Sequence, residues 1–349
     1  MQTEYVSMTE DNLDAAAIAR AGGILRGGGL VAFPTETVYG LGGDALNPES
    51  ARKIYAAKGR PSDNPLIVHI CRMEDVGKIA EEIPESFYLL AERFWPGPLT
   101  MILKKSGAVP DETTGGLATA AVRFPSNRIA QAVIRAAGGF VAAPSANRSG
   151  RPSPTLARYC REDLDGLVEM IIDGGPVDIG VESSIIDLSE EEPALLRPGF
   201  ITQEMLREVL GELAVDRTVL GTDAKERPRA PGMKYRHYAP RGELCIVEGE
   251  PARVTAYINR RAGEARGQGL RTGVICTDET RTLYRADSVK SAGTREDEGT
   301  IARALFRILR EFDDEGVQLM FSEFFDESGV GMAVMNRLIK AAGHRIVRV

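Results

Sequence analysis

The chain has 349 residues, of which 43% are hydrophobic and 27% are charged, and its formal net charge at pH 7 is -7. This length is too great for one typical hydrophobic core and predicts two domains. The acidic excess lies entirely before residue 241, because residues 241–349 contain equal numbers of basic and acidic side chains. An acidic chain is a poor autonomous binder of nucleic acid, because affinity for a phosphate backbone rests on clustered Lys and Arg, so stable direct binding is not expected.

Cysteine spacing and hydropathy argue against a zinc protein, a disulfide-stabilised protein and a membrane protein. The four cysteines, Cys71, Cys160, Cys245 and Cys276, are widely spaced and include no Cys-x-x-Cys pair, which argues against a zinc site or a disulfide framework. The N-terminus has no basic stretch followed by an apolar core, and no segment approaches the roughly 18 apolar residues needed to span a bilayer. We therefore expect no metal-ligating side chains, no membrane association and a cytoplasmic location.

Residues 1–213 predict a mixed α/β domain. Apolar residues recur at helical spacing over 13–25, three glycines follow at 27–29, and an apolar strand is expected at 30–33. A short helix over 48–57 begins after Asn47, a favourable N-cap residue. Further strands are predicted at 66–70, 98–103, 119–124, 139–143, 168–172, 183–188 and 194–197, and further helices near 84–94, 126–137 and 202–211. This order predicts a strongly twisted mixed sheet with helices.

The pattern changes after residue 213. Residues 214–240 predict a linker, because the stretch 227–240 combines prolines with cationic and aromatic side chains. Residues 241–349 then alternate strands with helices: strands at 243–247, 271–276, 317–322 and 344–348, and helices at 251–262, 299–312 and 329–342. Such alternation predicts a smaller, Rossmann-like parallel α/β domain with three layers. Its Gly329-Val330-Gly331 lacks the glycine fingerprint of a dinucleotide site, so we interpret this domain as a docking module.

Two short segments together suggest a site for a polyanion. Lys58-Gly59-Arg60 follows the predicted helix at 48–57, and Ser145-Ala146-Asn147 follows the apolar run 139–143 at a strand end, where open α/β sheets bind ligands. Lys is a point charge and Arg a planar fork, a combination that suits a phosphate chain. Each segment alone is more simply a solvated turn. A third segment favours a ligand site over a plain turn. There the strand at 30–33 ends at Pro34 and is followed by residues with hydroxyl groups, a carboxylate and glycines.

Seven segments occur in the order found in a known family. They are FPTETVYGL at 33–41, KGRP at 58–61, NPL at 64–66, FWPGPLT at 94–100, VRFP at 122–125, PSAN at 144–147 and ESSIID at 182–187. Together they resemble the YrdC-like fold of threonylcarbamoyl-AMP synthases, in the long form that carries an extra C-terminal domain. The resemblance covers roughly the first 200 residues.

The resemblance implies an activity. Such an enzyme, a nucleotidyltransferase, condenses L-threonine, bicarbonate or carbon dioxide, and ATP into threonylcarbamoyl-AMP and releases pyrophosphate. This is the first step of threonylcarbamoyladenosine formation in tRNA, and a downstream tRNA threonylcarbamoyl transferase is the expected partner. Nucleotidyl transfer depends mainly on alignment and on stabilisation of developing charge. The chain has only three histidines and no Ser-His-Asp or Cys-His signature, so we assign no covalent nucleophile.

The resemblance also implies site residues. The threonine pocket would consist of Thr35, His69, Arg123, Ala143 and Ser183, with Arg123 as a bidentate fork for the carboxylate. Without the resemblance, His69 would be read as an ordinary core histidine. The ATP side would consist of Lys58, Arg60, Asn64, Thr119, Ser145, Asn147, Ser153 and Arg197, and the catalytic groups among these would be Lys58, Arg60, Ser145 and Asn147.

Two further expectations concern magnesium and the linker. Mg²⁺ would be held chiefly by phosphate oxygens. Contact of Glu36 and Asp44 with the ion is an alternative, but both are interpreted as surface carboxylates in turns, which are more common than ligands. The linker combines proline stiffness with aromatics and cations, whereas a plain tether would be rich in Gly and Ser. We therefore expect it to act as a lid that contributes Tyr235, Arg236, His237 or Tyr238 to the bound nucleotide or threonine.

Two alternative functions are weighed against this interpretation. An RNA-binding or ribosome-binding YrdC-like module without catalysis would need a basic surface, and this chain is acidic. A carbamoyl-adenylate enzyme of the hydrogenase-maturation kind would carry zinc-finger cysteines, and the four cysteines here do not have that spacing.

Overall fold

The computed structural model describes residues 1–216 and 237–349, which form two compact units. The first unit comprises Met1–Ser149 and the described residues from Ser153 to 216. The second comprises Gly150–Pro152 and the described residues from 237 to the C-terminus. Most of the predicted linker, 214–240, lies outside the described residues, so the domain boundaries stay predictions.

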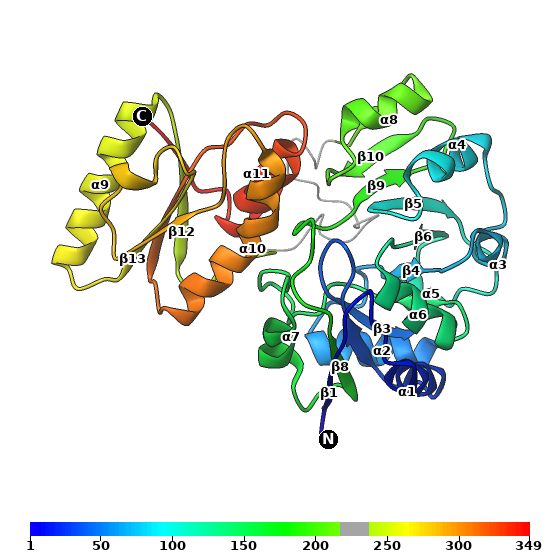
Figure 1. Cartoon of the computed structure of the whole chain (residues 1–349). Helices are drawn as coiled ribbons and strands as arrows, with labels where there is room; N and C mark the ends of the chain where they lie inside the picture. Colours follow the sequence, from blue (N-terminus) through cyan, green and yellow to red (C-terminus); the bar gives the residue numbers. More distant parts are fainter. Residues whose placement is uncertain (217–236) are drawn as a thin grey trace. The chain divides into compact units, whose positions relative to one another are not determined.

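The first unit is built on an 11-stranded mixed sheet with the order β1-β8-β2-β3-β7-β4-β6-β5-β9-β10-β11 (Figure 1). Its strands are β1 (Glu4–Ser7), β2 (Val31–Phe33), β3 (Gly40–Asp44), β4 (Ile67–His69), β5 (Leu99–Lys104), β6 (Thr119–Arg123), β7 (Val141–Ala142), β8 (Met170–Asp173), β9 (Ser184–Asp187), β10 (Ala194–Arg197) and β11 (Ala214–Val215). Parallel and antiparallel pairs both occur, as in β4 with β6 and β5 with β6. The mixed sheet predicted from the sequence is confirmed.

Helices cover both faces of this sheet. They are α1 (Ala15–Arg26), α2 (Pro48–Lys58), α3 (Val76–Ile79), α4 (Glu85–Phe94), α5 (Asp111–Thr114), α6 (Arg128–Ala136), α7 (Ala157–Leu164) and α8 (Gln203–Leu210), with a 3₁₀ turn at Met73–Asp75. Helices α1 and α6 pack against one another on one face, over a buried cluster that includes Val31 and Phe33. Ala32 points to the opposite face and joins the cluster under α2, α4 and α8. This alternation is the pleat of a strand buried on both faces.

Local capping explains where α2 begins and ends. The side chain of Asn47 accepts a hydrogen bond from the Glu49 amide at 3.0 Å, and Pro48 occupies the first turn. The helix stops at Gly59, whose φ of 61° lies in the left-handed region that glycine adopts without strain. The predicted helix is confirmed, and it extends one residue further than expected, to Lys58.

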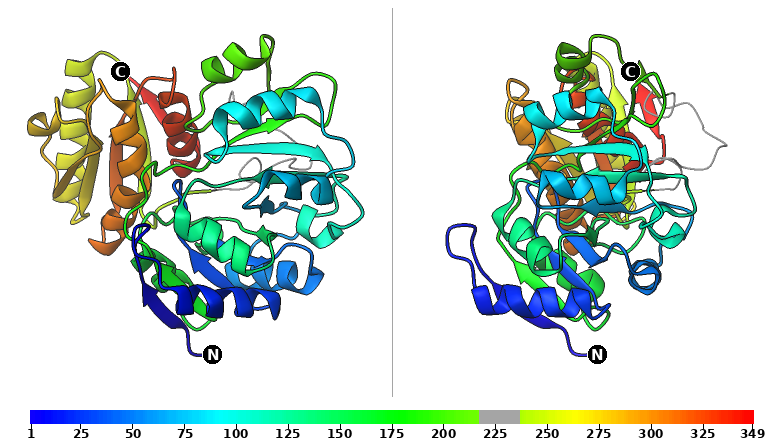
Figure 2. Two further views of the ribbon diagram at one scale, coloured as in Figure 1. Left: turned by 45° about the vertical axis from the view of Figure 1, so that its right-hand side comes forward. Right: turned by 90° about the vertical axis from the view of Figure 1, so that its right-hand side faces the viewer.

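The second unit is a three-layer α/β structure. Its five strands are β12 (Glu243–Glu248), β13 (Thr272–Cys276), β14 (Ser288–Ser291), β15 (Leu319–Glu323) and β16 (Ile346–Arg348), in the order β14-β13-β15-β12-β16. Every described pairing in this sheet is parallel. Helix α9 (Pro251–Gly267) lies on one side, and α10 (Glu298–Asp314) and α11 (Gly331–Ala341) lie on the other (Figure 2). The Rossmann-like parallel arrangement predicted from alternating elements is confirmed.

Several elements were not predicted from the sequence. Strands β1, β3 and β14 and helix α7 are formed by segments without a clear apolar period, and β3, with the sequence GLGGD, contains three glycines. Strand β3 forms because it pairs with β2 on one side and β7 on the other. No helix in the described ranges combines the length and the apolar character needed to cross a bilayer.

The short segment Gly150–Pro152 is bound within the second unit. The buried guanidinium of Arg310 on α10 donates to the Pro152 carbonyl oxygen from Nε at 3.0 Å and from Nη2 at 2.7 Å. The Ala239 amide donates to the Gly150 carbonyl at 2.8 Å, and Arg151 lies 3.5 Å from a carboxylate oxygen of Asp313. Two of these contacts use backbone carbonyls, so the local sequence of 150–152 contains no signal for them.

Candidate active site

Strand pairing brings together most of the residues predicted to form the threonine pocket. His69, at the end of β4, is paired with Arg123, at the end of β6. The neighbouring strand β7 pairs with β4 on its other side, so that the Ala143 amide donates to the Ile67 carbonyl at 2.9 Å. All three side chains are buried. His69 and Arg123 therefore lie together at the carboxyl ends of β4 and β6, where α/β sheets bind ligands, whereas Ala143 lies opposite Ile67 at the start of β4.

The fourth side of this cluster is the 34–39 turn between β2 and β3. Nη2 of Arg123 donates to Oε1 of Glu36 at 2.6 Å, and both side chains are about 5% exposed. The hydroxyl of Thr35 donates to the Val38 carbonyl at 2.6 Å and so stabilises the turn. The interpretation of Glu36 as a surface carboxylate is wrong, because the strands fold the turn over Arg123. No local sequence signal links two residues 87 positions apart.

His69 is a neutral residue in this cluster. Burial, and secondarily the positive charge of Arg123, lower the pKa of His69 from 6.5 to about 3. Its Nδ1 lies 3.0 Å from the Ile67 carbonyl oxygen. An imidazole with this pKa stays neutral near pH 7 and is a weak base, so His69 is suited to shape and hydrogen bonding and not to acid-base chemistry.

Ser183 joins the threonine cluster to the predicted ATP side. Its hydroxyl lies 2.7 Å from that of Thr100, a residue of β5 that is paired with Arg123. Arg197 donates to the Ser183 carbonyl from Nε at 3.0 Å and to its hydroxyl from Nη2 at 3.1 Å. The structure thus brings the two predicted subsites into direct contact through one serine.

Lys58 is the last residue of α2, and its ammonium group donates to the carbonyl oxygens of Ser145 and Asn147. The two segments first singled out in the sequence are therefore bound to each other. Lys58 is the last helical residue and Arg60 lies in the turn that follows, and both side chains are buried. Their exposed fractions are 3% and 8%, and Arg60 donates to the carbonyls of Asn64 and Pro65.

Other predicted ATP contacts also form hydrogen bonds within the first unit. The Ser145 hydroxyl donates to the side-chain oxygen of Asn147, and the Ser153 hydroxyl donates to Glu182. Asn64 is 1% exposed, and its Oδ1 has no hydrogen-bond donor within the described part of the chain. A buried amide oxygen without a partner is costly. It is therefore a good candidate to accept a hydrogen bond from a ligand.

Thr119 lies at the opposite end of β6 from Arg123. Strand β4 runs parallel to β6 with Ile67 opposite Ala121, so the Asn64–Pro65 stretch approaches the Thr119 end. Four residues of extended strand span on the order of 13 Å. The structure therefore separates Thr119 from the threonine cluster and groups it with Asn64 and Arg60.

The predicted lid residues fall into two groups. Tyr235 and Arg236 lie outside the described residues. His237 and Tyr238 are buried in the second unit, where the Tyr238 ring packs against Phe306 of α10 with ring centres 5.1 Å apart. Tyr238 has a φ of 65°, a conformation that side-chain-bearing residues rarely adopt. Contact of these two residues with a nucleotide stays a prediction.

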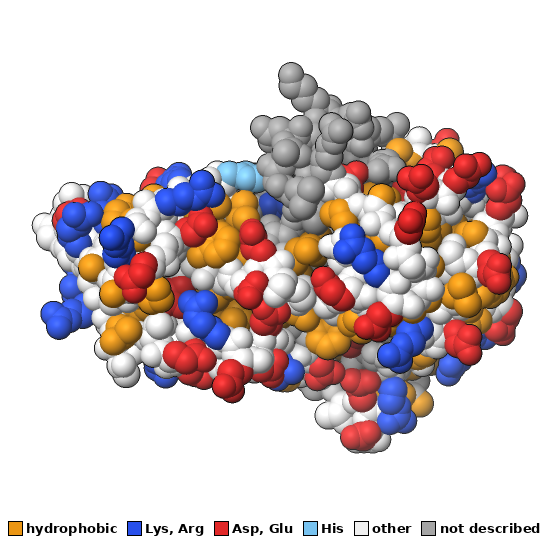
Figure 3. All heavy atoms as spheres, turned by 90° about the horizontal axis from the view of Figure 1, so that it is seen from above, with side chains coloured by type: hydrophobic (Ala, Val, Ile, Leu, Met, Phe, Trp, Pro, Cys, Tyr) orange, Lys and Arg blue, Asp and Glu red, His pale blue; other side chains and the backbone are white. Residues whose placement is uncertain are grey.

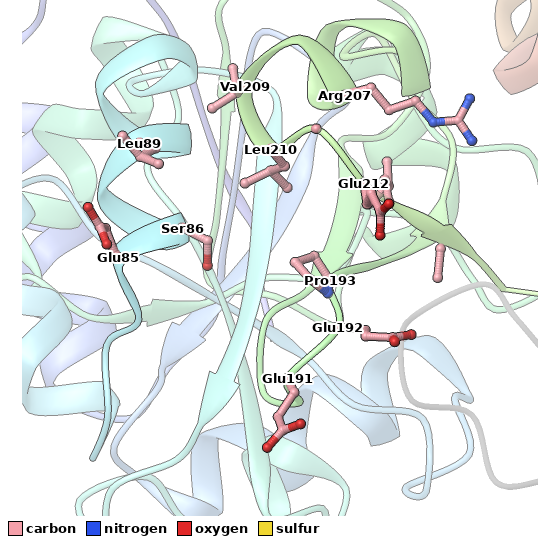
Figure 4. Close-up of a pocket in the computed structure, with 13 residues that line it drawn as sticks. Glu85, Ser86, Leu89, Glu191, Glu192, Pro193, Arg207, Val209, Leu210 and Glu212 are labelled. Atoms are coloured by element: carbon pink, nitrogen blue, oxygen red, sulfur yellow. The ribbon is translucent and has the colours of Figure 1, made fainter.

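A hollow elsewhere in the first unit contains none of the predicted site residues. It lies between α4 and α8 and the 191–193 loop, and its lining includes Leu89, Leu210 and four glutamates (Figure 4). The glutamates are Glu85, Glu191, Glu192 and Glu212. This acidic lining disfavours a nucleotide. Figure 3 shows acidic and basic side chains interspersed over one face of the molecule.

By contrast, the residues predicted to bind substrates include four buried cations: Lys58, Arg60, Arg123 and Arg197. Buried Lys and Arg are rare unless paired. Here Arg123 pairs with Glu36, and Lys58, Arg60 and Arg197 donate to backbone carbonyls. This arrangement suits a substrate with several negative charges.

Comparisons with known proteins identify the family. A family model described as "Telomere recombination" matches residues 23–199, and one described as "Threonylcarbamoyl-AMP synthase, C-terminal domain" matches residues 201–343. A threonylcarbamoyl-AMP synthase of Bacillus subtilis is 47% identical over 99% of this chain and 98% of its own length. The chain belongs to the threonylcarbamoyl-AMP synthase family. A second synthase, from Pyrococcus abyssi, is 48% identical over 97% of this chain and 98% of its own length.

A solved structure supports the same assignment. The crystal structure of P. abyssi Sua5 complexed with L-threonine matches with a TM-score of 0.93 and 46% identity, and the match covers all of both chains. Membership of the threonylcarbamoyl-AMP synthase family makes this chain an enzyme and favours catalysis over a purely RNA-binding role. The family resemblance stated from seven sequence segments is confirmed.

Proposed function

We propose that this chain makes threonylcarbamoyl-AMP from L-threonine, bicarbonate or carbon dioxide, and ATP, and releases pyrophosphate. The observation that carries the proposal is the likeness, over the full length of both chains, to a P. abyssi structure complexed with L-threonine. The product would serve tRNA modification through a downstream threonylcarbamoyl transferase. The cytoplasmic location expected from the sequence stays a prediction.

The amino acid would bind at the cluster around Arg123. Its carboxylate would receive two hydrogen bonds from the guanidinium, which only arginine can supply in a planar fork. Thr35, Ala143 and Ser183 would surround the side chain, and the neutral imidazole of His69 would add a hydrogen-bonding group without a charge. The nitrogen of threonine would then be carboxylated to a carbamate.

ATP would bind on the side of Lys58, Arg60, Asn64 and Thr119, with Arg197 between the two substrates. The carbamate carboxylate would attack the α-phosphorus, and the bond to the departing pyrophosphate would break. Buried cations would stabilise the charge that develops on the phosphate oxygens, and their fixed positions would avoid reorganisation during the reaction. We assign Lys58, Arg60, Ser145 and Asn147 to this nucleotide subsite.

Magnesium would accompany the nucleotide. No group of three or more His, Cys, Asp or Glu side chains that could hold a metal ion occurs in residues 1–216 and 237–349. Mg²⁺ would therefore be held by the phosphate oxygens and would neutralise part of their charge.

The experiment is an assay of pyrophosphate release from ATP by the purified full-length protein. L-threonine and bicarbonate together should stimulate release, and mass spectrometry should detect threonylcarbamoyl-AMP. Serine and valine serve as comparison amino acids, because each lacks one feature of threonine. Pyrophosphate release that ignores threonine, or no release at all, would contradict the proposed function.

A further inference from the structure

Glu36 has one carboxylate oxygen that the protein leaves without a donor. Oε1 accepts the 2.6 Å hydrogen bond from Arg123, but Oε2 is inaccessible to solvent and has no hydrogen-bond partner within the described residues. The side chain as a whole is 5% exposed. The backbone is fixed as well, because the Glu36 carbonyl accepts from the Ile179 amide at 2.9 Å.

This arrangement differs from that of another buried carboxylate in the same unit, which is paired with a half-exposed arginine. Asp75, 2% exposed, receives hydrogen bonds on both oxygens, from Nε and Nη2 of Arg72, each at 3.0 Å. Such a bidentate pair satisfies the carboxylate completely. The Arg123–Glu36 pair leaves Oε2 unsatisfied, and a buried acceptor without a donor is destabilising. The missing donor at Glu36 therefore points to a ligand.

The position of Oε2 beside Arg123 restricts the chemistry of that ligand. In the proposed function, Arg123 binds the carboxylate of the amino acid. The α-ammonium group of an amino acid is attached to the next carbon, so a cation and an anion in contact on the protein match the two charges of the zwitterion. An ammonium group has three N–H donors, and its bond to a buried carboxylate is charge-assisted.

We propose that Glu36 accepts a hydrogen bond from the α-ammonium group of the amino-acid substrate. Glu36 and Arg123 then form a pair that recognises a free amino acid and rejects a hydroxy acid that lacks the amino group. This inference rests on the proposed function, because it takes Arg123 as the carboxylate site. It adds a substrate-binding residue to the pocket predicted from the sequence, which did not include Glu36.

The test compares two ligands of the full-length protein. L-threonine and 3-hydroxybutyrate share the carboxylate and the hydroxyl, but only threonine has the ammonium group. Dissociation constants of both are measured by NMR titration for the wild-type protein and for Glu36→Gln. The amide keeps the size of the side chain and an oxygen for Arg123. We expect threonine binding to weaken by about 30-fold, the value of one hydrogen bond between charged groups, and 3-hydroxybutyrate binding to change by less than about threefold.

Asp75→Asn is the matched control, since it removes the charge of another buried carboxylate paired with arginine in the same unit. It should leave the affinity for both ligands unchanged. Equal weakening of both ligands by Glu36→Gln would overturn the inference, because a purely structural role affects both. Unchanged threonine affinity would overturn it as well. In either case the proposed function would stand, whereas a wild-type protein that does not bind threonine would overturn both.

A second variant covers the case in which Glu36→Gln does not fold. Glu36→Asp keeps the charge but withdraws the carboxylate by one methylene group. It should weaken threonine binding more than 3-hydroxybutyrate binding. Equal effects on the two ligands would again overturn the inference. Fluorescence of the single tryptophan, Trp95, which is buried in the first unit, reports whether each variant is folded.

Discussion

His69 and Arg123 are paired across the parallel strands β4 and β6, and the buried imidazole remains neutral beside the guanidinium. The pKa of His69 is lowered to about 3, first by burial and then by the charge of Arg123. A histidine in an unfolded chain has a pKa of about 6.5. Between these two values the unfolded state binds a proton that the folded state does not bind, so stability falls as the pH falls below about 6.5.

This linkage predicts a pH effect that His69→Gln removes. Between pH 7.5 and pH 5, the free energy of unfolding of the first unit should fall by about 2 kcal/mol more in the wild-type protein than in the variant. Urea unfolding followed by the fluorescence of Trp95 measures this difference. Parallel losses of stability in the two proteins would mean that His69 is protonated in the folded state.

Lys58→Met should lower both activity and stability. The ammonium group binds the Ser145 and Asn147 carbonyls, so its removal takes a charged donor from two backbone acceptors and costs about 1–3 kcal/mol of stability. Loss of a fixed cation at the proposed phosphate subsite should cost about 2–4 kcal/mol of transition-state stabilisation. Pyrophosphate release at saturating ATP and urea unfolding measure the two effects.

Lys53→Met is the control for this variant. Lys53 lies on the same helix and donates to the Gly28 carbonyl at 2.7 Å, outside the proposed site. It should affect stability alone. Near-normal pyrophosphate release by Lys58→Met would show that Lys58 is structural and makes no contact with the nucleotide.

Arg123→Lys should impair the use of threonine more than the use of ATP. Lysine can still form an ion pair with Glu36, but a point charge cannot reproduce a planar fork on a carboxylate. The Michaelis constant for threonine should rise by about tenfold or more, the value of one charge-assisted hydrogen bond, and that for ATP should change little. Arg72→Lys, in the bidentate pair of half-exposed Arg72 with buried Asp75, serves as the control. A raised constant for ATP with an unchanged constant for threonine would move Arg123 to the nucleotide side.

Arg310→Met should release the segment Gly150–Pro152 within the second unit. The two hydrogen bonds to the Pro152 carbonyl would be lost, and that carbonyl would be left without its charged donor. Hydrogen exchange followed by mass spectrometry should show faster exchange of a peptide that covers 150–152. Lys290→Met is the control, because Lys290 pairs with Glu311 of the same helix and with Glu315 at its C-cap. Equal exchange of this peptide in the two variants would rule out a specific role for Arg310.

The sequence by itself determined the class of fold and the family. Apolar period, capping residues and glycines are signals that act over a few neighbouring residues. They placed the start of α2 after Asn47. They also placed the alternating strands and helices of the second unit close to their observed bounds. Seven short segments in a fixed order identified the family, although segments such as KGRP and PSAN alone are compatible with solvated turns. The same local signals could not predict β3, whose three glycines become a strand only between β2 and β7.

Only the tertiary structure decided the state of the charged side chains. Glu36 and Lys58 stand in turn-like or helix-end sequences that are usually solvated, yet both are buried, since strand pairing brings Arg123 to the first and the Ser145–Asn147 segment to the second. Arg123 and Glu36 are 87 residues apart in the sequence, and so are Ser145 and Lys58. Local sequence patterns contain no information about contacts at such distances. The burial and pairing of Glu36 and Lys58, and the neutral state of His69, follow from the assembled sheet. In its interior, desolvation makes every unpaired charge costly.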